Sequence, residues 1–451
     1  MDAEPANEWI DAESRVERAH SLYEDGRWAE AAAELRAAIS INPNNPAWHF
    51  NLALTLEAMC EYERACESFS RALELNEDDP ETLNCLGANL TRLGKYAEAL
   101  EQFRRIEQID SSYEPAYCSR IVTYTEMGDH DKAELMFYLA RQIKEDCPTC
   151  YFNIGASLYA RGQYDRALYC WKQTLRLDPD HPYANVRAAE ACWAKGDLEG
   201  ARRHYQAALR IDDGDVEVLL DYGELLMDMA EDEAARKQFI RAMELDAGNA
   251  CAHFCLGQLA WRNGRSAAAE SHYRKVLRVD NRYPGAHAKL AEVLIRQGKV
   301  QDASRHLVHE LRNCGNDAKT LQEVARLLLE ARQARRANEV LRRLVSLQPS
   351  DAGAQHNLAV SFFMMEQLRE GIRHCRRALK LKPDYPMALY NLALAHFRMG
   401  QLPRARRYAA RALTIAPNDP NIRLLARRLR GPDLWSRLRR RFRALGRKAE
   451  A

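Results

Sequence analysis

The chain has 451 residues, 47% of them hydrophobic, and a formal net charge of +2. This composition excludes an intrinsically disordered chain, and the length allows either several domains or one elongated array, because a single core rarely grows beyond about 300 residues. The charge is unevenly spread: residues 1–317 carry 37 Lys and Arg against 54 Asp and Glu, a net −17, whereas residues 318–451 carry 29 against 10, a net +19.

Residues 1–11 form an acidic lead, with four Asp or Glu and no Lys or Arg. A secretory signal would instead be basic and then apolar, and the chain has no run of about 20 apolar residues that would span a bilayer. Twelve cysteines, most without paired spacing, suit a reducing compartment better than a disulfide framework. We therefore expect a cytoplasmic protein, and the basic C-terminus leaves peripheral contact with a membrane open.

From Ala12 to Asp419 a unit of 34 residues recurs twelve times without insertion or deletion. Position 20 of the unit is alanine in eleven cases and glycine in one, Gly371. Position 8 is Gly or Ala in eleven of the twelve units, as expected where two helices cross closely. Glycines at position 15, such as Gly162, suit a left-handed cap between two helices, and prolines such as Pro148 fall at unit boundaries. Each unit is therefore predicted to be a pair of helices.

Position 24 carries a large ring in seven consecutive units, which we expect to reach the next repeat. These residues are Phe69, Phe103, Phe137, Trp171, Tyr205, Phe239 and Tyr273.

After the last unit, residues 420–431 begin like a thirteenth first helix but place Arg427 where the units have Gly or Ala, which predicts a solvating C-terminal capping helix. Gly431 and Pro432 then end this helix. In the basic tail, residues 432–451, a helical wheel separates the Leu, Trp and Phe side chains completely from the Arg and Lys side chains. We expect an amphipathic segment there.

Small residues at positions 8 and 20, a bulky residue at 24 and Pro at 32 resemble the tetratricopeptide repeat family. The stretch "YNLALAHFRMGQLPRARRYAARALTIAPND", Tyr390–Asp419, carries much of that pattern, with His396 and Ala409 where larger side chains are usual. The resemblance covers twelve units of 34 residues. It implies an all-α fold, a right-handed superhelical solenoid of antiparallel helix pairs, that binds protein segments.

The ninth and tenth units depart from this pattern, with Glu310 where Ala is usual and Arg332 where Gly is usual. We predict a looser joint between Arg305 and Gln333.

The sequence shows no catalytic signature. It has no phosphate-binding GxxxxGK[ST] motif, no glycine string of a dinucleotide-binding strand, and no segment outside the repeats long enough for a catalytic domain. We predict no enzyme activity, no catalytic residue, no metal and no cofactor.

Three groups of cysteine and histidine residues could still offer metal ligands or a redox pair. "CPTC" pairs Cys147 with Cys150 across a repeat boundary, and coincidence is favoured over a dithiol or half of a metal site because no second CxxC completes a set of four. In "CAHFC", Cys251 and Cys255 are expected to face the groove, while His253 points into the core. A role of the two cysteines as small polar residues that fill space is favoured over a metal site.

The third group is "HLVHELRNC", with His306, His309 and Cys314. None of the three falls on a core position, so all are expected at the surface.

The resemblance implies that first helices of successive units line a concave channel into which positions 2, 5, 6, 9, 12 and 13 point. An asparagine amide at position 6 can donate to and accept from a peptide backbone, although asparagine is also simply common there. Aromatic residues at positions 5 and 12 are only partly buried by the repeat and are typical of recognition surfaces. The predicted partner-groove residues are Phe50, Asn51, Phe152, Asn153, Tyr159, Trp193, Phe254, Trp261, Asn357, Phe363, Tyr390, Asn391 and Phe397.

Arginines in the last three units recur three or four residues apart, so they share one face of each second helix. With the tail they form a predicted anionic-surface set: Arg336, Arg343, Arg373, Arg377, Arg404, Arg407, Arg411, Arg437, Arg440, Arg441 and Arg443. Docking within the chain or to a protein partner, a membrane surface and nucleic acid all remain open. Salt-sensitive self-association with the acidic part of another copy is a further hypothesis.

The sequence thus favours a non-catalytic scaffold that binds partner segments in the groove. The alternative is an adaptor whose basic C-terminal region contacts membrane lipid or nucleic acid, with the repeats as a spacer.

Overall fold

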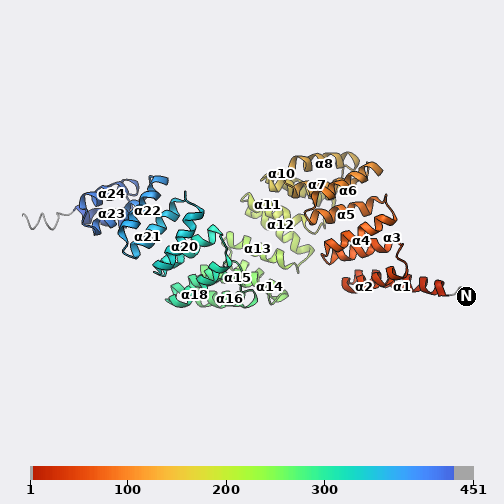
Figure 1. The fold of residues 1–451 in the computed structure, drawn as a ribbon, viewed down its shortest axis with the longest axis horizontal. Helices are drawn as coiled ribbons and strands as arrows, with labels where there is room; N and C mark the ends of the chain where they lie inside the picture. Colours follow the sequence, from red (N-terminus) through yellow and green to blue (C-terminus); the bar gives the residue numbers. More distant parts are fainter. Residues whose placement is uncertain (1–3, 431–451) are drawn as a thin grey trace, which may run out of the picture. The chain divides into compact units, whose positions relative to one another are not determined.

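The computed structural model describes the backbone of residues 4–430 and the side chains of residues 11–429 (Figure 1). Over this range the regular structure consists of 25 α-helices, without any strand. Three residues separate the two helices of a pair, and four to six separate one pair from the next. Such short turns make the paired helices antiparallel neighbours.

Residue contacts divide the chain into two compact units, residues 1–231 and 232–451, each of which is described by itself. The first unit contains α1 (Glu4–Glu24), α2 (Trp28–Ile41), α3 (Pro46–Ala58), α4 (Tyr62–Leu75), α5 (Pro80–Arg92), α6 (Tyr96–Ile109), α7 (Glu114–Glu126), α8 (His130–Ile143), α9 (Pro148–Ala160), α10 (Tyr164–Leu177), α11 (Ala184–Ala194), α12 (Leu198–Ile211) and α13 (Val216–Asp228). Because α1 begins at Glu4, most of the predicted acidic lead belongs to the first helix.

The second unit contains α14 (Asp232–Leu245), α15 (Ala250–Arg262), α16 (Ser266–Val279), α17 (Ala286–Arg296), α18 (Val300–Asn313), α19 (Ala318–Glu330), α20 (Ala334–Leu347), α21 (Ala352–Met364), α22 (Leu368–Leu381), α23 (Pro386–Arg398), α24 (Leu402–Ile415) and α25 (Pro420–Arg430). Among the helices of residues 4–430, none combines the length and the apolar character needed to cross a membrane.

The turn inside each pair depends on a left-handed residue at position 15. Gly162 has φ +72°, a value that costs glycine little because it has no Cβ. Cys60, Ala230, Arg332 and Glu366 adopt the same conformation without being glycine, with φ between +57° and +63°. The departure at Arg332 therefore leaves the geometry of the turn unchanged.

In some pairs the crossing of the two helices is closed by a ring over a glycine. A Cβ added to Gly87 would lie 2.5 Å from the ring of Phe103, and one added to Gly155 would overlap the indole of Trp171. Phe103 and Trp171 are 0% and 1% exposed, so neither ring has free space beside it. These two position-24 rings thus pack on the first helix of their own pair. The sequence-based prediction, that such rings reach the next repeat, did not include this contact.

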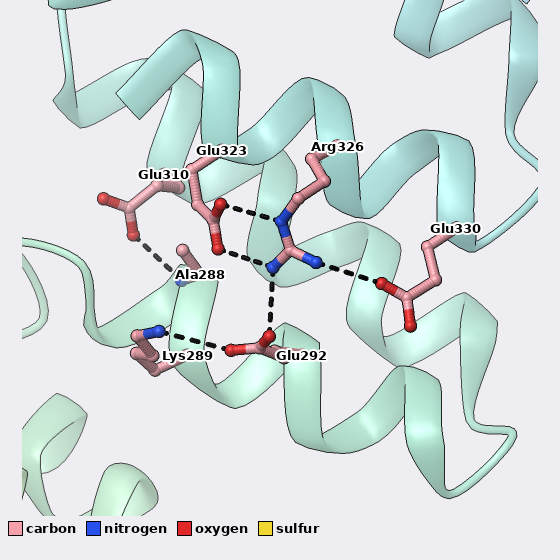
Figure 2. A network of polar contacts seen from close by, with 7 residues as sticks. All are labelled: Ala288, Lys289, Glu292, Glu310, Glu323, Arg326 and Glu330. Atoms are coloured by element: carbon pink, nitrogen blue, oxygen red, sulfur yellow. Dashed lines mark hydrogen bonds and ion pairs between the residues drawn. The ribbon is translucent and has the colours of Figure 1, made fainter. Parts of the chain in front are cut away.

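Glu310, predicted to weaken its joint, has a structural role (Figure 2). Its carboxylate is 4% exposed and accepts hydrogen bonds from the backbone N–H groups of Gly285 and Ala288, both at 3.1 Å. Those N–H groups open α17, where no helical partner is available to them. Glu310 therefore caps the N-terminus of α17, and the looser joint, which stays a prediction, loses this part of its argument.

Beside this cap, Arg326 joins α17 to α19 (Figure 2). Its guanidinium lies 2.7 Å from Glu323, 3.0 Å from Glu292 and 3.2 Å from Glu330. The hydrogen bond to Glu323, with further contributions from Glu292, raises the pKa of Arg326 above its usual value. Several charges in one network stabilise a helix contact more reliably than an isolated surface pair.

Candidate partner-binding surface

The predicted partner-groove residues all lie on first helices of the pairs: α3, α9, α11, α15, α21 and α23. First helices of neighbouring pairs contact one another directly, as α5, α7 and α9 do in the first unit and α17, α19, α21 and α23 do in the second. We call the surface that these helices form within each unit the first-helix face. Asn51 is exposed, and the other predicted groove residues are partly buried.

Two of the predicted asparagine clamps already bind within the chain. The Asn153 amide donates to the carbonyl oxygen of Cys118 at 3.1 Å, and the Asn391 amide lies 2.9 Å from Nε2 of His356. Each contact joins two neighbouring first helices. Part of the hydrogen-bonding capacity of these amides is therefore used to align the repeats.

Several predicted groove rings also contact their own framework. Phe50 meets Phe69 edge-on with centroids 5.6 Å apart, and Phe254 packs at 5.7 Å on Tyr273. The guanidinium of Arg296 lies 5.0 Å from the ring of Trp261. These rings support the repeats on one side and leave the other side partly accessible.

In the first unit, α9, α11, α12 and α13 enclose an acidic, aromatic hollow of about 430 Å³. We call it the acidic hollow; it is lined by Tyr159, Glu190, Trp193, Ala194, Tyr205 and Asp221. The Trp193 indole N–H donates to Asp228 at 3.0 Å, and Tyr159 packs on Trp171 with centroids 5.9 Å apart. Both aromatic walls are thus held in place by neighbouring side chains.

Of the two carboxylates in the acidic hollow, Glu190 is paired with Arg187 at 2.9 Å, whereas Asp221 has an unfavourable environment for its charge. Burial, followed by the nearby charges of Glu190 and Glu224, raises the pKa of Asp221 to about 6. A carboxyl group with such a pKa lacks enough positive charge nearby to stabilise its ionised form. A cation placed in the hollow would supply that charge.

Sequence reasoning identified the aromatic part of this hollow but not its carboxylates. Tyr159 and Trp193 were predicted groove residues, and the structure brings them together. Glu190 and Asp221 were not among the predicted groove residues. They stand at positions 9 and 6 of their units, which the family resemblance directs into the groove.

Besides a cavity beside Asn153, two further hollows contain predicted groove residues. One of about 300 Å³ lies between α1 and α3 and includes Asn51 with His20 and Tyr23. The other, of about 180 Å³ between α21 and α23, includes Phe363 and Asn391. Both are mostly apolar, whereas the acidic hollow is charged.

The structure corrects two expectations about the cysteine and histidine groups. His306 and Cys314 are half-buried rather than on the surface, and Nδ1 of His306 lies 2.9 Å from Nδ1 of His287. Cys255 is 1% exposed, so it does not face an open groove. The prediction that His253 points into the core is confirmed by its 6% exposure, and His309 is exposed as expected.

The seven predicted anionic-surface arginines that the structure describes lie on α20, α22 and α24, and all seven are exposed. Arg373 pairs with Glu370 at 2.6 Å, while Arg411 donates to the carbonyl oxygen of Pro383 at 2.8 Å. The four predicted tail residues, Arg437, Arg440, Arg441 and Arg443, lie outside the described residues.

Comparison with family models matches repeated parts of the chain to one family. Models of the tetratricopeptide repeat match residues 46–79, 81–106, 152–216, 193–254, 260–309 and 362–429, and a TPR repeat model matches residues 19–59. Together they cover more than half of the chain. No curated protein matched the sequence.

Among solved structures, the chain is similar to one in the APC/C hetero-tetramer Cut9–Hcn1, with 14% identity, TM-score 0.42, and coverage of 92% of this chain and 95% of that one. Yeast Tom70 matches with 16% identity and TM-score 0.40, over 97% of this chain and 99% of that one. YrrB, described as a TPR protein with an unusual peptide-binding site, matches with 18% identity and TM-score 0.36, over 41% of this chain and 96% of that one.

Proposed function

Since the chain belongs to the tetratricopeptide repeat family, an all-helical solenoid of helix pairs, we propose that it is a non-catalytic scaffold that binds partner protein segments along its first-helix face. The principal contact in this proposal is a basic side chain, Lys or Arg, of the partner seated in the acidic hollow.

One observation carries this proposal: the acidic hollow combines two carboxylates with three aromatic rings on neighbouring helices. A guanidinium or ammonium group would pair with Glu190 and Asp221 and lie against the rings of Tyr159 or Trp193. Basic and aromatic anchors in partly desolvated pockets commonly carry most of the binding free energy of an interface. The hollow is therefore suited to a partner of defined chemistry.

The charge of the surrounding region supports the same partner. Residues 1–231, the unit that contains the hollow, carry 23 Lys and Arg against 44 Asp and Glu, a net −21, so a basic segment would be attracted before contact is made. Binding to this region is expected to weaken with salt.

The test is selection of displayed extended peptides on the full chain. We expect the wild-type protein to enrich peptides with Arg or Lys, and Glu190→Gln with Asp221→Asn to lose that enrichment. The loss of both half-buried carboxylates should lower the affinity about tenfold or more. Glu199→Gln, which removes an exposed carboxylate from the second helix α12, is the matched control and should select the same peptides as wild type.

The pH dependence provides an independent readout. Because the pKa of Asp221 is raised to about 6, lowering the pH from 7 to 5 neutralises this carboxylate and should weaken binding of a selected basic peptide. The Asp221→Asn variant should lose this pH dependence. Identical peptides and identical pH profiles in wild type and variant would contradict the proposed site.

A second candidate function rests on the exposed arginines of α20, α22 and α24. An aligned set of guanidinium groups suits contact with an anionic surface, either lipid or nucleic acid. We expect Arg373→Gln, Arg377→Gln and Arg407→Gln together to reduce cosedimentation with phosphatidylserine vesicles or binding of a labelled RNA. Retained binding in the triple variant would remove this candidate.

A further inference from the structure

A group of thiols converges where α7 meets the start of α9, away from the acidic hollow. Cys147 is the N-cap residue of α9, Cys150 lies in its first turn, and Glu114 and Cys118 lie one turn apart on α7. From the sequence alone, the CxxC spacing of Cys147 and Cys150 is interpreted as a coincidence at a repeat boundary rather than as a metal or redox site. The structure adds a third thiol and a carboxylate from the preceding repeat.

The four side chains form a compact set of donor atoms. A single oxygen, Glu114 Oε1, lies 2.7 Å from Sγ of Cys147, 2.9 Å from Sγ of Cys118 and 3.1 Å from Sγ of Cys150. The sulfurs of Cys118 and Cys147 are 3.8 Å apart, and all four ligand atoms lie within 4.8 Å of one another.

These distances suit one tetrahedral ion. With metal–sulfur bonds of about 2.3 Å, the sulfurs of a tetrahedral zinc site are about 3.8 Å apart. The shorter sulfur–oxygen distances are those of protonated thiols that donate to a carboxylate. Loss of the thiol protons to an incoming cation would remove these hydrogen bonds and let the Glu114 side chain withdraw to a ligand distance.

The surroundings favour thiolate ligands. The exposed fractions of Cys118, Cys147 and Cys150 are 5%, 3% and 0%, so competing water is largely excluded. The backbone N–H of Cys150 donates to Sγ of Cys147 at 3.2 Å, and the N-terminus of α9 adds a positive dipole. Such outer contacts orient metal ligands and stabilise their negative charge.

A route to the site is also present. A cavity of about 350 Å³ on the first-helix face is lined by Glu114 and Cys118 together with Asn84, Arg92 and Asn153. Glu114 is only half-buried, and both its side chain and Cys118 border the cavity. An ion can therefore reach the buried sulfurs past Glu114 without unfolding of the repeats.

We propose that Cys118, Cys147, Cys150 and Glu114 bind a soft divalent cation of the zinc class and so join the fourth and fifth repeats. Three thiols release their protons to solvent on binding, and the three thiolates and one carboxylate around a dication leave a net charge of −2. Thiolates select zinc over calcium or magnesium. Four protein ligands close the coordination shell, which is typical of a structural rather than a catalytic site.

The test uses the full chain, purified under reducing conditions, with zinc measured by elemental analysis and with cobalt as a spectroscopic substitute. We expect one equivalent of zinc and, after exchange, a thiolate-to-cobalt charge-transfer band. Cys118→Ser and Cys150→Ser should lose the zinc, whereas Cys192→Ser, which changes a buried cysteine of α11 outside the cluster, should retain it. Glu114→Gln should keep the charge-transfer band but bind zinc at least tenfold more weakly.

Zinc binding should also raise the thermal unfolding midpoint of the wild type but not of Cys118→Ser, because the ion binds only the folded site. If the serine variants do not fold, cobalt titration of the wild type still shows whether the thiols bind a metal ion. A folded wild-type chain that binds zinc in no defined ratio and shows no thiolate-to-cobalt band overturns the proposal. So does a Cys147–Cys150 disulfide that forms under the same reducing conditions.

Discussion

A regular pair of helices, α9–α10, and the irregular stretch α17–α22 show two ways of closing the same crossing. In α9–α10 the glycine is on the first helix, Gly155, and the ring is on the second, Trp171. In α21–α22 the arrangement is reversed, since Gly371 is on the second helix and Phe363 on the first. In these two pairs a residue without a Cβ lies against a ring, and either helix can supply each of them.

The irregular stretch also compensates its other departures. Glu310 replaces an alanine and finds two backbone donors, while Arg332 replaces a glycine and keeps the left-handed turn. A departure from the repeat therefore need not be a weak point. The predictions below test this comparison.

The largest effect is expected at the regular crossing. Gly155→Ala would normally stabilise a helix interior, but its Cβ would overlap the buried indole of Trp171, so we expect a loss of about 3 kcal/mol in the free energy of unfolding. Thermal unfolding followed by circular dichroism measures it. Gly162→Ala is the control, because nothing lies within 4 Å of its Cβ position and only its φ of +72° is unfavourable, which costs about 1 kcal/mol. Equal losses in both variants would contradict the steric explanation.

The next effect is expected at Glu310. Glu310→Ala leaves the N–H groups of Gly285 and Ala288 without their acceptor, so α17 should lose about 2 kcal/mol of local stability. Hydrogen exchange at these amides is the measurement.

The matched control for this cap is Glu330→Gln, an exposed partner of Arg326 in the same network (Figure 2), which should change stability by less than about 0.5 kcal/mol. Unchanged exchange in Glu310→Ala would restore the prediction of a loose joint around the ninth and tenth repeats.

The reversed crossing is expected to be more tolerant than the regular one. A Cβ at Gly371 would also overlap a ring, but Phe363 is half-buried and can turn toward solvent, so Gly371→Ala should cost only about 1 kcal/mol. The double variant Phe363→Ala with Gly371→Ala should show a coupling free energy in a double-mutant cycle. A loss as large as that of Gly155→Ala would show that the position of the glycine, rather than the mobility of the ring, sets the cost.

The repeat period was sufficient to predict the helix pairs, because small residues, caps and boundary prolines recur at fixed positions of each unit. It also indicated that Tyr159 and Trp193 share a surface. The proximity of Glu190 and Asp221 could also have been predicted from the sequence. Both residues are acidic, and they stand at groove positions 9 and 6 of adjacent units.

Other contacts leave no signal in the repeat. The partner of Glu310 is the backbone of α17, and a backbone N–H is present at nearly every residue, so nothing in the sequence marks it. The thiol cluster joins residues of two repeats, with Glu114 and Cys150 36 residues apart. Whether such side chains meet depends on how far one pair is rotated against the next, and the 34-residue period alone does not fix that rotation.

The smallest effect is a pH dependence confined to the irregular stretch. Burial, followed by His287 and then His309, lowers the pKa of His306 to about 4, and burial also lowers the pKa of His287. Arg274 acts in the same direction and Asp302 opposes it. The corresponding positions of α9–α10 hold Tyr151 and Cys170, neither of which gains charge between pH 7 and 5.

In the unfolded chain a histidine has a pKa of about 6.5, whereas the lowered pKa values of His287 and His306 keep both rings neutral in the fold to a lower pH. The unfolded state therefore takes up more protons as the pH falls below about 6.5, and stability is lost in that direction. Because His306 is only half-buried, we expect a loss of about 1 kcal/mol between pH 7 and 5. Hydrogen exchange, corrected for its intrinsic pH dependence, should show the loss in α17 and α18 but not in α9 and α10. The His306→Gln variant should abolish most of it, and an unchanged pH profile in that variant would assign the effect to the carboxylates instead.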